Sequence, residues 1–181
     1  SIELEGVRGT LDCFVVEPMA DMSSSAEHYV CIYSLRDVDV VMFYHEGGVD
    51  VGDVDAKAAK LEVRAGTALD AGAVAAGLLG GLPDAVRPRV ATFLAALHRF
   101  YVELAFTYLE INPIVMVGDS VLPLDLAAKV DLTAQQDCAD KWGTLDMPAP
   151  FGRSRLPEEE YVEALDEKTG ASLKLTVLNP E

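Results

Sequence analysis

The strongest periodic pattern lies in the middle of the chain, where apolar residues recur at steps of three and four between Val86 and Leu104. This spacing places them on one side of an α-helix, so it predicts a long amphipathic helix. Asp84 precedes the pattern and is the expected N-cap, because its carboxylate can accept from N–H groups of the first turn. His98 and Arg99 are expected on or near the polar side of this helix.

Strand-like runs precede this helix. Residues 29–34 and 38–44 are rich in β-branched and aromatic side chains, and the three residues between them suit a hairpin. Another apolar run at 11–16 predicts a strand that ends at Glu17-Pro18, because proline interrupts strand pairing. A short helix is expected to begin near Asp70.

A second β pair is expected after the long helix. Apolar residues dominate 106–117 and 121–126, and Gly118-Asp119 between them favours a tight turn. Strands and helices therefore mix along the chain without strict alternation. The fold class is α+β or open α/β.

The character of the sequence changes after Trp142. The stretch MPAPFGRSRLPEEE is rich in proline and charge, which is typical of a connector, and a short helix near 157–166 and a strand-like run SLKLTVL follow. We therefore expect one domain over residues 1–145, and a connector with the start of a further α/β domain over 146–181. Because the chain opens on Ser1 rather than Met, we expect it to be a piece of a longer polypeptide.

Composition excludes several classes of protein. Half of the 181 residues are hydrophobic, so a core can form, and 14 Lys and Arg against 30 Asp and Glu give a net charge of −16. Such a charge repels phosphate backbones and anionic lipid, so we expect neither a nucleic acid nor a membrane as partner. An anionic ligand would need local cations or a metal ion. No stretch approaches the ~18 apolar residues of a membrane-spanning helix.

The three cysteines, Cys13, Cys31 and Cys138, are widely spaced and have apolar neighbours. This favours buried, reduced thiols and a cytoplasmic protein. No secretory signal is visible. No order of Ser, His and Asp, or of Cys and His, predicts a nucleophile.

The candidate metal site depends on the register of the second β pair. If Gly118-Asp119 form a two-residue turn, Asn112 lies directly opposite Asp125. Glu110 lies two residues before Asn112, so both point to the same face. An amide oxygen and a carboxylate so placed suit Mg²⁺, which takes one or two protein ligands together with phosphates and waters. The alternative is a polar pair on a solvated face, and a three-residue turn would separate the two residues.

Other candidates carry weaker signals. Glu17 ends an apolar run where a ligand could meet freed backbone groups, and Glu27 precedes a strand, where a carboxylate could accept from ribose hydroxyls. Both could equally be ordinary acids at strand ends. Gly47-Gly48 could let the backbone approach a phosphate, or form a simple turn. His45 could cap an element or border the core.

Several long motifs, in one order, resemble the ATP citrate lyase family. They are EP followed by a serine-containing loop, HYVCIY, FYHEGGVDVGDVDAKA, FTYLEINPIV, LDLAAKVD, PFGR and LDEKTGASLKLTVLNP. The resemblance covers nearly the whole chain. The related succinyl-CoA synthetase β subunit shares the EGG turn and LEINP, but the run LDLAAK favours the citrate-cleaving family.

The resemblance implies the C-terminal part of an ATP-grasp fold, in which nucleotide lies between two α+β subdomains. It assigns to the nucleotide Glu17, Pro18 and Ala20 beside the adenine, Glu27 at the ribose and Asp125 at the phosphates. It assigns Mg²⁺ to Asn112 and Asp125. It also implies a second cation near the next domain, held by Asp166, Thr169 and the Ala171 carbonyl.

The resemblance further implies a cytoplasmic enzyme of transferase and lyase chemistry that supplies acetyl-CoA for lipid synthesis. The whole enzyme would convert citrate, CoA and ATP to acetyl-CoA, oxaloacetate, ADP and phosphate, through a histidine that lies outside this chain. CoA and citrate would bind elsewhere, so the partner is the rest of the polypeptide or a second subunit, in a homotetramer. The alternatives are a succinyl-CoA-type ligase subunit and a non-catalytic assembly module.

Overall fold

The computed structural model describes residues 1–4, 6–11, 14–20, 26–49, 52–144, 151–152, 156–169 and 175. The chain divides into two compact units. The larger comprises Met19–Thr144, and the smaller combines Ser1–Pro18 with Leu145–Glu181.

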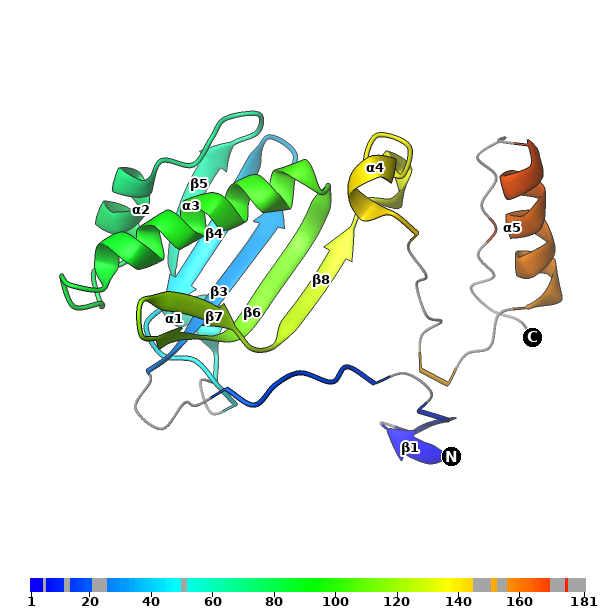
Figure 1. Cartoon of the computed structure of the whole chain (residues 1–181), viewed down its shortest axis with the longest axis horizontal. Coiled ribbons are helices and arrows are strands. Elements are labelled where there is room, and N and C mark those ends of the chain that lie inside the picture. Colours follow the sequence, from blue (N-terminus) through cyan, green and yellow to red (C-terminus); the bar gives the residue numbers. More distant parts are fainter. Residues whose placement is uncertain are drawn as a thin grey trace. The chain divides into compact units, whose positions relative to one another are not determined.

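The larger unit is built on a six-stranded antiparallel sheet (Figure 1). Its strands are β3 (Glu27–Ser34), β4 (Val38–Tyr44), β5 (Ala59–Arg64), β6 (Phe106–Val117), β7 (Ser120–Pro123) and β8 (Leu126–Val130). The order is β5-β4-β3-β6, and the free side of β6 pairs first with β8 and then with β7. The long strand β6 is therefore bonded along both of its sides.

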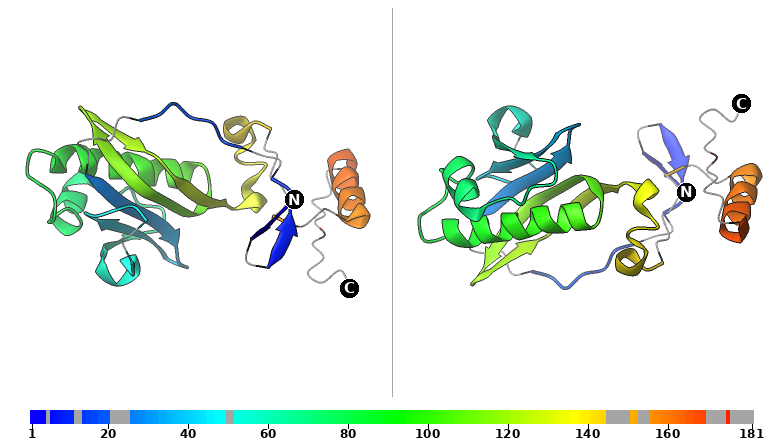
Figure 2. Two further views of the ribbon diagram at one scale, coloured as in Figure 1. Left: turned by 90° about the horizontal axis from the view of Figure 1, so that it is seen from below. Right: turned by 90° about the horizontal axis from the view of Figure 1, so that it is seen from above.

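Two helices, α2 (Ala71–Gly77) and α3 (Arg87–Glu103), lie on the same face of this sheet (Figures 1 and 2). Every second residue of the central strands points toward these two helices. Together with the apolar residues of the helices, these side chains form the main hydrophobic core. Its fully buried members include Val30, Ile32, Val41, Val74, Leu94 and Leu109. This side of the sheet is the helix-covered face.

The opposite side, here called the open face, carries a smaller cluster of buried residues: Tyr29, Cys31, Val40 and Met42, with Ala58 beside them. The short helix α1 (Val54–Lys57) packs against this cluster through Val54. The larger unit ends with a 3₁₀ turn, η1 (Leu132–Ala134), and a short helix, α4 (Ala139–Trp142).

The two hairpins agree with the sequence pattern. β3 and β4 pair around residues 35–37, and Val117 pairs with Ser120 around Gly118-Asp119. Gly118 has a φ of +59°, a left-handed conformation that two-residue hairpin turns require. The short helix near Asp70 is also confirmed, because the Asp70 carboxylate accepts from the Ala73 N–H at 2.9 Å as its N-cap.

The prediction that Asp84 caps α3 is wrong. The helix begins at Arg87 after Val86, and no side chain caps it. A preceding turn supplies the acceptor, since Pro83 O accepts from the N–H groups of Val86 and Arg87. Asp84 instead forms an ion pair with Arg87 at 3.0 Å.

The strand expected at 11–16 is also absent from its described residues, Leu11 and Phe14–Val16. Phe14 and Val16 are 75% and 91% exposed. A β-strand requires a neighbour for its backbone hydrogen bonds, and no described segment pairs with these residues. High β propensity alone therefore does not form the strand.

The smaller unit contains the hairpin of β1 (Ile2–Leu4) and β2 (Val7–Gly9), and a helix, α5 (Pro157–Thr169). The helix expected near 157–166 is thus confirmed and extends slightly further. The strand-like run SLKLTVL lies, apart from Leu175, outside the described residues. None of the helices in the described part of the chain is long and apolar enough to cross a bilayer.

Candidate functional site

The turn after β4 brings together two residues that are far apart in the sequence, Glu27 and Asn112. The Gly48 N–H donates to Asn112 Oδ1 at 2.7 Å, and Asn112 Nδ2 donates to Gly48 O at 3.4 Å. Gly48 has a φ of +93°, and a Cβ added there would collide with the Glu27 carboxylate. The positive φ therefore favours glycine at position 48, and any side chain there would also force the Glu27 carboxylate to move.

Gly47 and His45, which precede Gly48, contact His28 at the start of β3. A Cβ on Gly47 would lie 2.7 Å from the carbonyl carbon of His28, so this glycine also allows a close backbone approach. His28 Nδ1 donates to the carbonyl of His45 at 2.8 Å. Burial lowers the pKa of His28, which favours the neutral ring for this bond. His45 itself is exposed, and its carbonyl helps to anchor the turn.

Asn112 and Asp125 lie opposite each other across the β6 hairpin, as the two-residue turn predicts. The residue pairs that flank Asn112 along β6 are Ile111 with Leu126 and Ile114 with Pro123. The Asn112 N–H donates to the backbone O of Asp125 at 3.1 Å. Asn112 is half-buried, whereas Asp125 is exposed between β7 and β8.

The chemistry of this pair fits a hard cation. The Asn112 side-chain oxygen accepts from Gly48 and keeps a second lone pair, and the exposed Asp125 offers a carboxylate. Among the described residues, no group of three or more His, Cys, Asp or Glu could hold a metal ion. A divalent ion held by Asn112 and Asp125 would therefore complete its coordination with phosphates and water.

A second polar cluster lies further along the open face, around Glu110. The hydroxyl of Tyr29 donates to Glu110 Oε2 at 3.1 Å, and the hydroxyl of Tyr108 donates to the same oxygen. Burial, with a contribution from Glu110, raises the pKa of both tyrosines, so both hydroxyls remain donors. These residues border a pocket of about 290 Å³, whose rim also carries Asp55 and Lys60.

The thiol of Cys31 also lines this pocket, but it is not a nucleophile. Cys31 is 2% exposed, and burial raises the pKa of its thiol. The reactive form of cysteine is the thiolate, which this environment disfavours. Cys31 and Cys138 are buried free thiols, as expected, and Cys13 lies outside the described residues.

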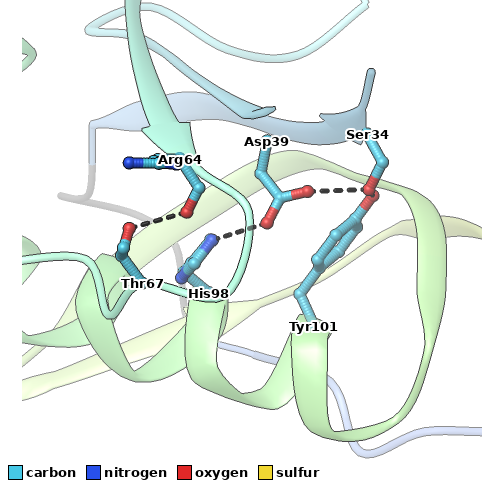
Figure 3. Close-up of polar contacts among 6 residues, drawn as sticks. All are labelled: Ser34, Asp39, Arg64, Thr67, His98 and Tyr101. Carbon is cyan, nitrogen blue, oxygen red and sulfur yellow. Dashed lines mark hydrogen bonds and ion pairs between the residues drawn. The ribbon is translucent and has the colours of Figure 1, made fainter. Parts of the chain in front are cut away.

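The expectation that His98 lies near the polar side of α3 is wrong, because His98 is 2% exposed. Its Nε2 lies 3.0 Å from Asp39 Oδ2, and Ser34 Oγ donates to Asp39 Oδ1 at 2.8 Å (Figure 3). Because Ser34 gives its proton to Asp39, the Tyr101 hydroxyl must donate to Ser34 Oγ, at 2.8 Å. Burial raises the pKa of Tyr101 to about 12, which keeps this donor protonated.

The residue types of a hydrolase triad are thus present in this cluster, but their connections differ from those of a triad. Ser34 donates to the carboxylate rather than to the histidine, so no base activates its hydroxyl. His98 occupies the buried side of α3 because it lies four residues after Leu94 and three before Tyr101, both of which are buried. We assign this cluster to packing rather than to chemistry.

The structure describes only some of the residues expected at the adenine and at the second cation. Glu17 and Pro18 are exposed residues of the smaller unit, whereas Ala20 is a half-buried residue of the larger one. The Thr169 hydroxyl donates to the Leu165 carbonyl at 2.7 Å, at the end of α5. The side chain of Asp166, and Ala171 as a whole, lie outside the described part of the chain.

The tyrosines around Glu110 are the polar residues that the sequence analysis missed. Tyr108 precedes Glu110 by two residues in the same strand, so the period of two could have placed them on one face. Tyr29 comes from β3, and its contact depends on the β3–β6 register, which contains a bulge between His28 and Val30. No local pattern in the sequence indicates that bulge.

Comparison with known proteins agrees with the motifs. Residues 1–142 match the ATP-citrate synthase ATP-grasp domain family. ATP-citrate synthase of Mus musculus is 52% identical over 174 residues, which are 96% of this chain and 16% of that protein. Probable ATP-citrate synthase subunit 2 of Schizosaccharomyces pombe is 42% identical, over 96% of this chain and 42% of that protein.

A solved structure gives the same result. ATP citrate lyase from Methanothrix soehngenii, determined in complex with citrate and coenzyme A, matches with a TM-score of 0.76 and 34% identity. The match covers 99% of this chain and 42% of that chain, so the present sequence spans less than half of these relatives. With a mixed helix and sheet architecture, the expected α+β fold class is confirmed. The chain belongs to the ATP-citrate synthase ATP-grasp domain family.

Proposed function

We propose that this chain forms one side of the Mg-ATP site of an ATP citrate lyase. The observation that carries the proposal is the Gly48 turn, which lies against the Glu27 carboxylate and is bonded to Asn112, with Asp125 opposite Asn112 between β7 and β8. In this site Glu27 would accept from the ribose hydroxyls, and Asn112 and Asp125 would hold the magnesium ion. The same register is expected of a structural polar pair, so the binding experiment below decides between them.

Phosphoryl transfer depends mainly on positioning and on neutralising charge. Bound Mg²⁺ would supply the positive charge that a chain of net charge −16 lacks near a triphosphate. The contribution of the protein is orientation. Because Gly48 both donates to and accepts from the amide of Asn112, it fixes which edge of that amide carries the oxygen.

Two parts of the proposed site rest on the family motifs. Glu17, Pro18 and Ala20 would border the adenine. Asp166, Thr169 and the Ala171 carbonyl would supply oxygens to a second cation near the next domain.

For the whole protein, we propose the conversion of citrate, CoA and ATP to acetyl-CoA, oxaloacetate, ADP and phosphate in the cytoplasm, for lipid synthesis. The curated and solved relatives are named for this enzyme, which supports the proposal. The histidine that accepts the phosphoryl group, and the residues that bind CoA and citrate, would lie outside this chain. Its partner would be the rest of the polypeptide or a second subunit, in a homotetramer.

The test is calorimetric titration of Mg-ATP into the whole protein that contains this chain, together with an assay of phosphoryl transfer. Asp125→Asn keeps the shape of the side chain but removes one charge from the proposed metal site. We expect a loss of at least about tenfold in transfer at ordinary magnesium, partly restored by excess magnesium. Asp119→Asn, in the adjacent turn, is the matched control and should have little effect.

Near-normal transfer by Asp125→Asn would contradict the metal assignment. Dependence on succinate instead of citrate would identify a succinyl-CoA-type ligase. Failure of the whole protein to bind any Mg-nucleotide would leave a non-catalytic assembly module.

A further inference from the structure

The Glu110 carboxylate is held at one of its two oxygens. Tyr29 of β3 donates to Oε2 at 3.1 Å, and Tyr108, which lies on β6 with Glu110, donates to the same oxygen. Among the described residues, no donor contacts Oε1. Hydrogen bonds to a carboxylate are stronger than bonds between neutral groups, so the two hydroxyls together fix its orientation.

The two tyrosines are themselves well supported. Tyr29 is 6% exposed, and β3 lies beside β6 in the sheet (Figure 1). Lys129 Nζ lies 5.7 Å from the centroid of the Tyr108 ring, a distance typical of a cation–π contact. Because burial raises the pKa of both hydroxyls, both tyrosines keep the protons that they donate to Glu110.

No cation among the described residues neutralises Glu110. None of the ion pairs in the described part of the chain includes it. Lys60 lines the same pocket, but it lies on β5, which β4 and β3 separate from β6. Glu110 therefore keeps a carboxylate oxygen without a partner, and such oxygens are the preferred ligands of hard divalent cations.

The proposed metal ligand Asn112 lies two residues further along β6, on the same face as Glu110. Strands rise about 3.4 Å per residue, so the Cα atoms of these two residues are about 7 Å apart. A glutamate side chain that is free to rotate spans much of this distance. Mg²⁺ usually takes one or two protein ligands and leaves its other positions to phosphates and water. A third protein ligand would occupy a position that the phosphates need.

We propose that Tyr29 and Tyr108 are positioning residues, which keep Glu110 from coordinating the magnesium ion at Asn112 and Asp125. This inference rests on the proposed Mg-ATP site and adds the residues that keep its coordination open for phosphate. Without the two hydroxyls, the Glu110 carboxylate turns toward the metal and becomes a further ligand. The metal is then bound more tightly while phosphoryl transfer slows, a combination that a loss of folding does not produce.

The test uses Mn²⁺ as the probe, titrated without nucleotide into the whole protein that contains this chain and followed by electron paramagnetic resonance and calorimetry. Tyr29→Phe combined with Tyr108→Phe should tighten Mn²⁺ binding at least about fivefold, because a carboxylate joins the ligands. Phosphoryl transfer by this paired variant should fall about tenfold at saturating Mg²⁺. Either single substitution leaves one hydroxyl on Oε2 and should give a smaller change.

Two controls identify Glu110 as the group that moves. Adding Glu110→Gln to the paired variant should return the Mn²⁺ affinity to within about twofold of the original, because an uncharged amide is a weaker ligand. Tyr33→Phe removes a hydroxyl from the same pocket that does not donate to Glu110, and it should leave the Mn²⁺ affinity unchanged.

The proposal is overturned if the paired variant binds Mn²⁺ no more tightly than the original protein, or if Glu110→Gln does not reverse the gain. Should the paired variant fail to fold, the two single variants decide by the same criterion.

Asp125→Asn distinguishes this result from a failure of the Mg-ATP site itself. If Asp125→Asn weakens Mn²⁺ binding and the paired variant leaves it unchanged, the metal site stands and the positioning role is wrong. If Asp125→Asn has no effect on Mn²⁺ affinity, the metal assignment is wrong and the positioning role is overturned with it.

Discussion

Two tyrosine–carboxylate clusters lie on opposite faces of the same sheet, and they differ mainly in what covers them. On the helix-covered face, Asp39 is 8% exposed and accepts from Ser34 and His98 beneath α3 (Figure 3). On the open face, Glu110 is half-buried and accepts from Tyr29 and Tyr108 beside a pocket.

The two clusters contain similar residue types but differ in their exposure to solvent. A buried carboxylate has to be satisfied by protein donors, and Ser34 and His98 supply these to Asp39. Glu110 shares its face with Asn112 and retains access to the pocket. We therefore expect mutations in the first cluster to reduce stability, and mutations in the second to change activity at nearly constant stability.

The largest expected effect is on the buried cluster. His98→Ala leaves the Asp39 carboxylate buried with Ser34 as its remaining side-chain partner, so the free energy of unfolding should fall by about 3–5 kcal/mol. Urea denaturation measures the change. The exposed His45 is the control, because His45→Ala should stay within about 0.5 kcal/mol of the original protein. Equal losses for the two variants would show that the buried pair does not stabilise the fold.

The turn that supports the open face should be the next most sensitive. Gly48→Ala and Gly66→Ala both place alanine at a positive φ, but Gly66 has nothing within 4 Å of an added Cβ, whereas Gly48 meets Glu27. Gly48→Ala should therefore cost about 1 kcal/mol more than Gly66→Ala, at the low end of overpacking, because the flexible Glu27 side chain has to move aside. The same denaturation assay compares them. Identical costs would mean that Glu27 can move aside freely.

A smaller effect is expected at the carboxylate of the open face. Glu110→Gln should lower phosphoryl transfer by the whole protein about tenfold, or about 1.4 kcal/mol of activation free energy, because it removes a charge from the face that carries Asn112. Its free energy of unfolding should change by less than about 1 kcal/mol. Glu62→Gln, at an exposed position of β5, is the control. A loss of stability without a loss of activity would place Glu110 with Asp39 as a structural residue.

The last prediction concerns pH, and its effect appears only above pH 10. Burial raises the folded-state pKa of Tyr101 to about 12, above the ordinary value of 10.0. Its contribution to stability is therefore complete below pH 10 and is lost as the pH rises toward 12, because the unfolded chain ionises first. Tyr101→Phe should reduce the slope of unfolding free energy against pH in this interval. An unchanged slope would contradict a role for this tyrosine.

The sequence analysis succeeded where the determining interaction is local. Asp70 caps the helix that starts one residue later, and Gly118-Asp119 set the register that brings Asn112 opposite Asp125. It failed where the position of a side chain depends on a partner that is distant in the sequence. Nothing near His98 in the sequence indicates Asp39, which lies 59 residues away, and the preceding turn made Asp84 unnecessary as a cap.

The long strand β6 links the accuracy of folding to the assembly of the site. Leu109 and Ile111, which are 0% and 1% exposed, alternate along it with Tyr108, Glu110 and Asn112. A slip of one residue would turn the polar set toward the helices and Leu109 toward water, at a large cost in buried apolar area. The hydrophobic core therefore also determines which residues reach the open face, because a misaligned β6 would lose the burial of Leu109 and Ile111 that stabilises it.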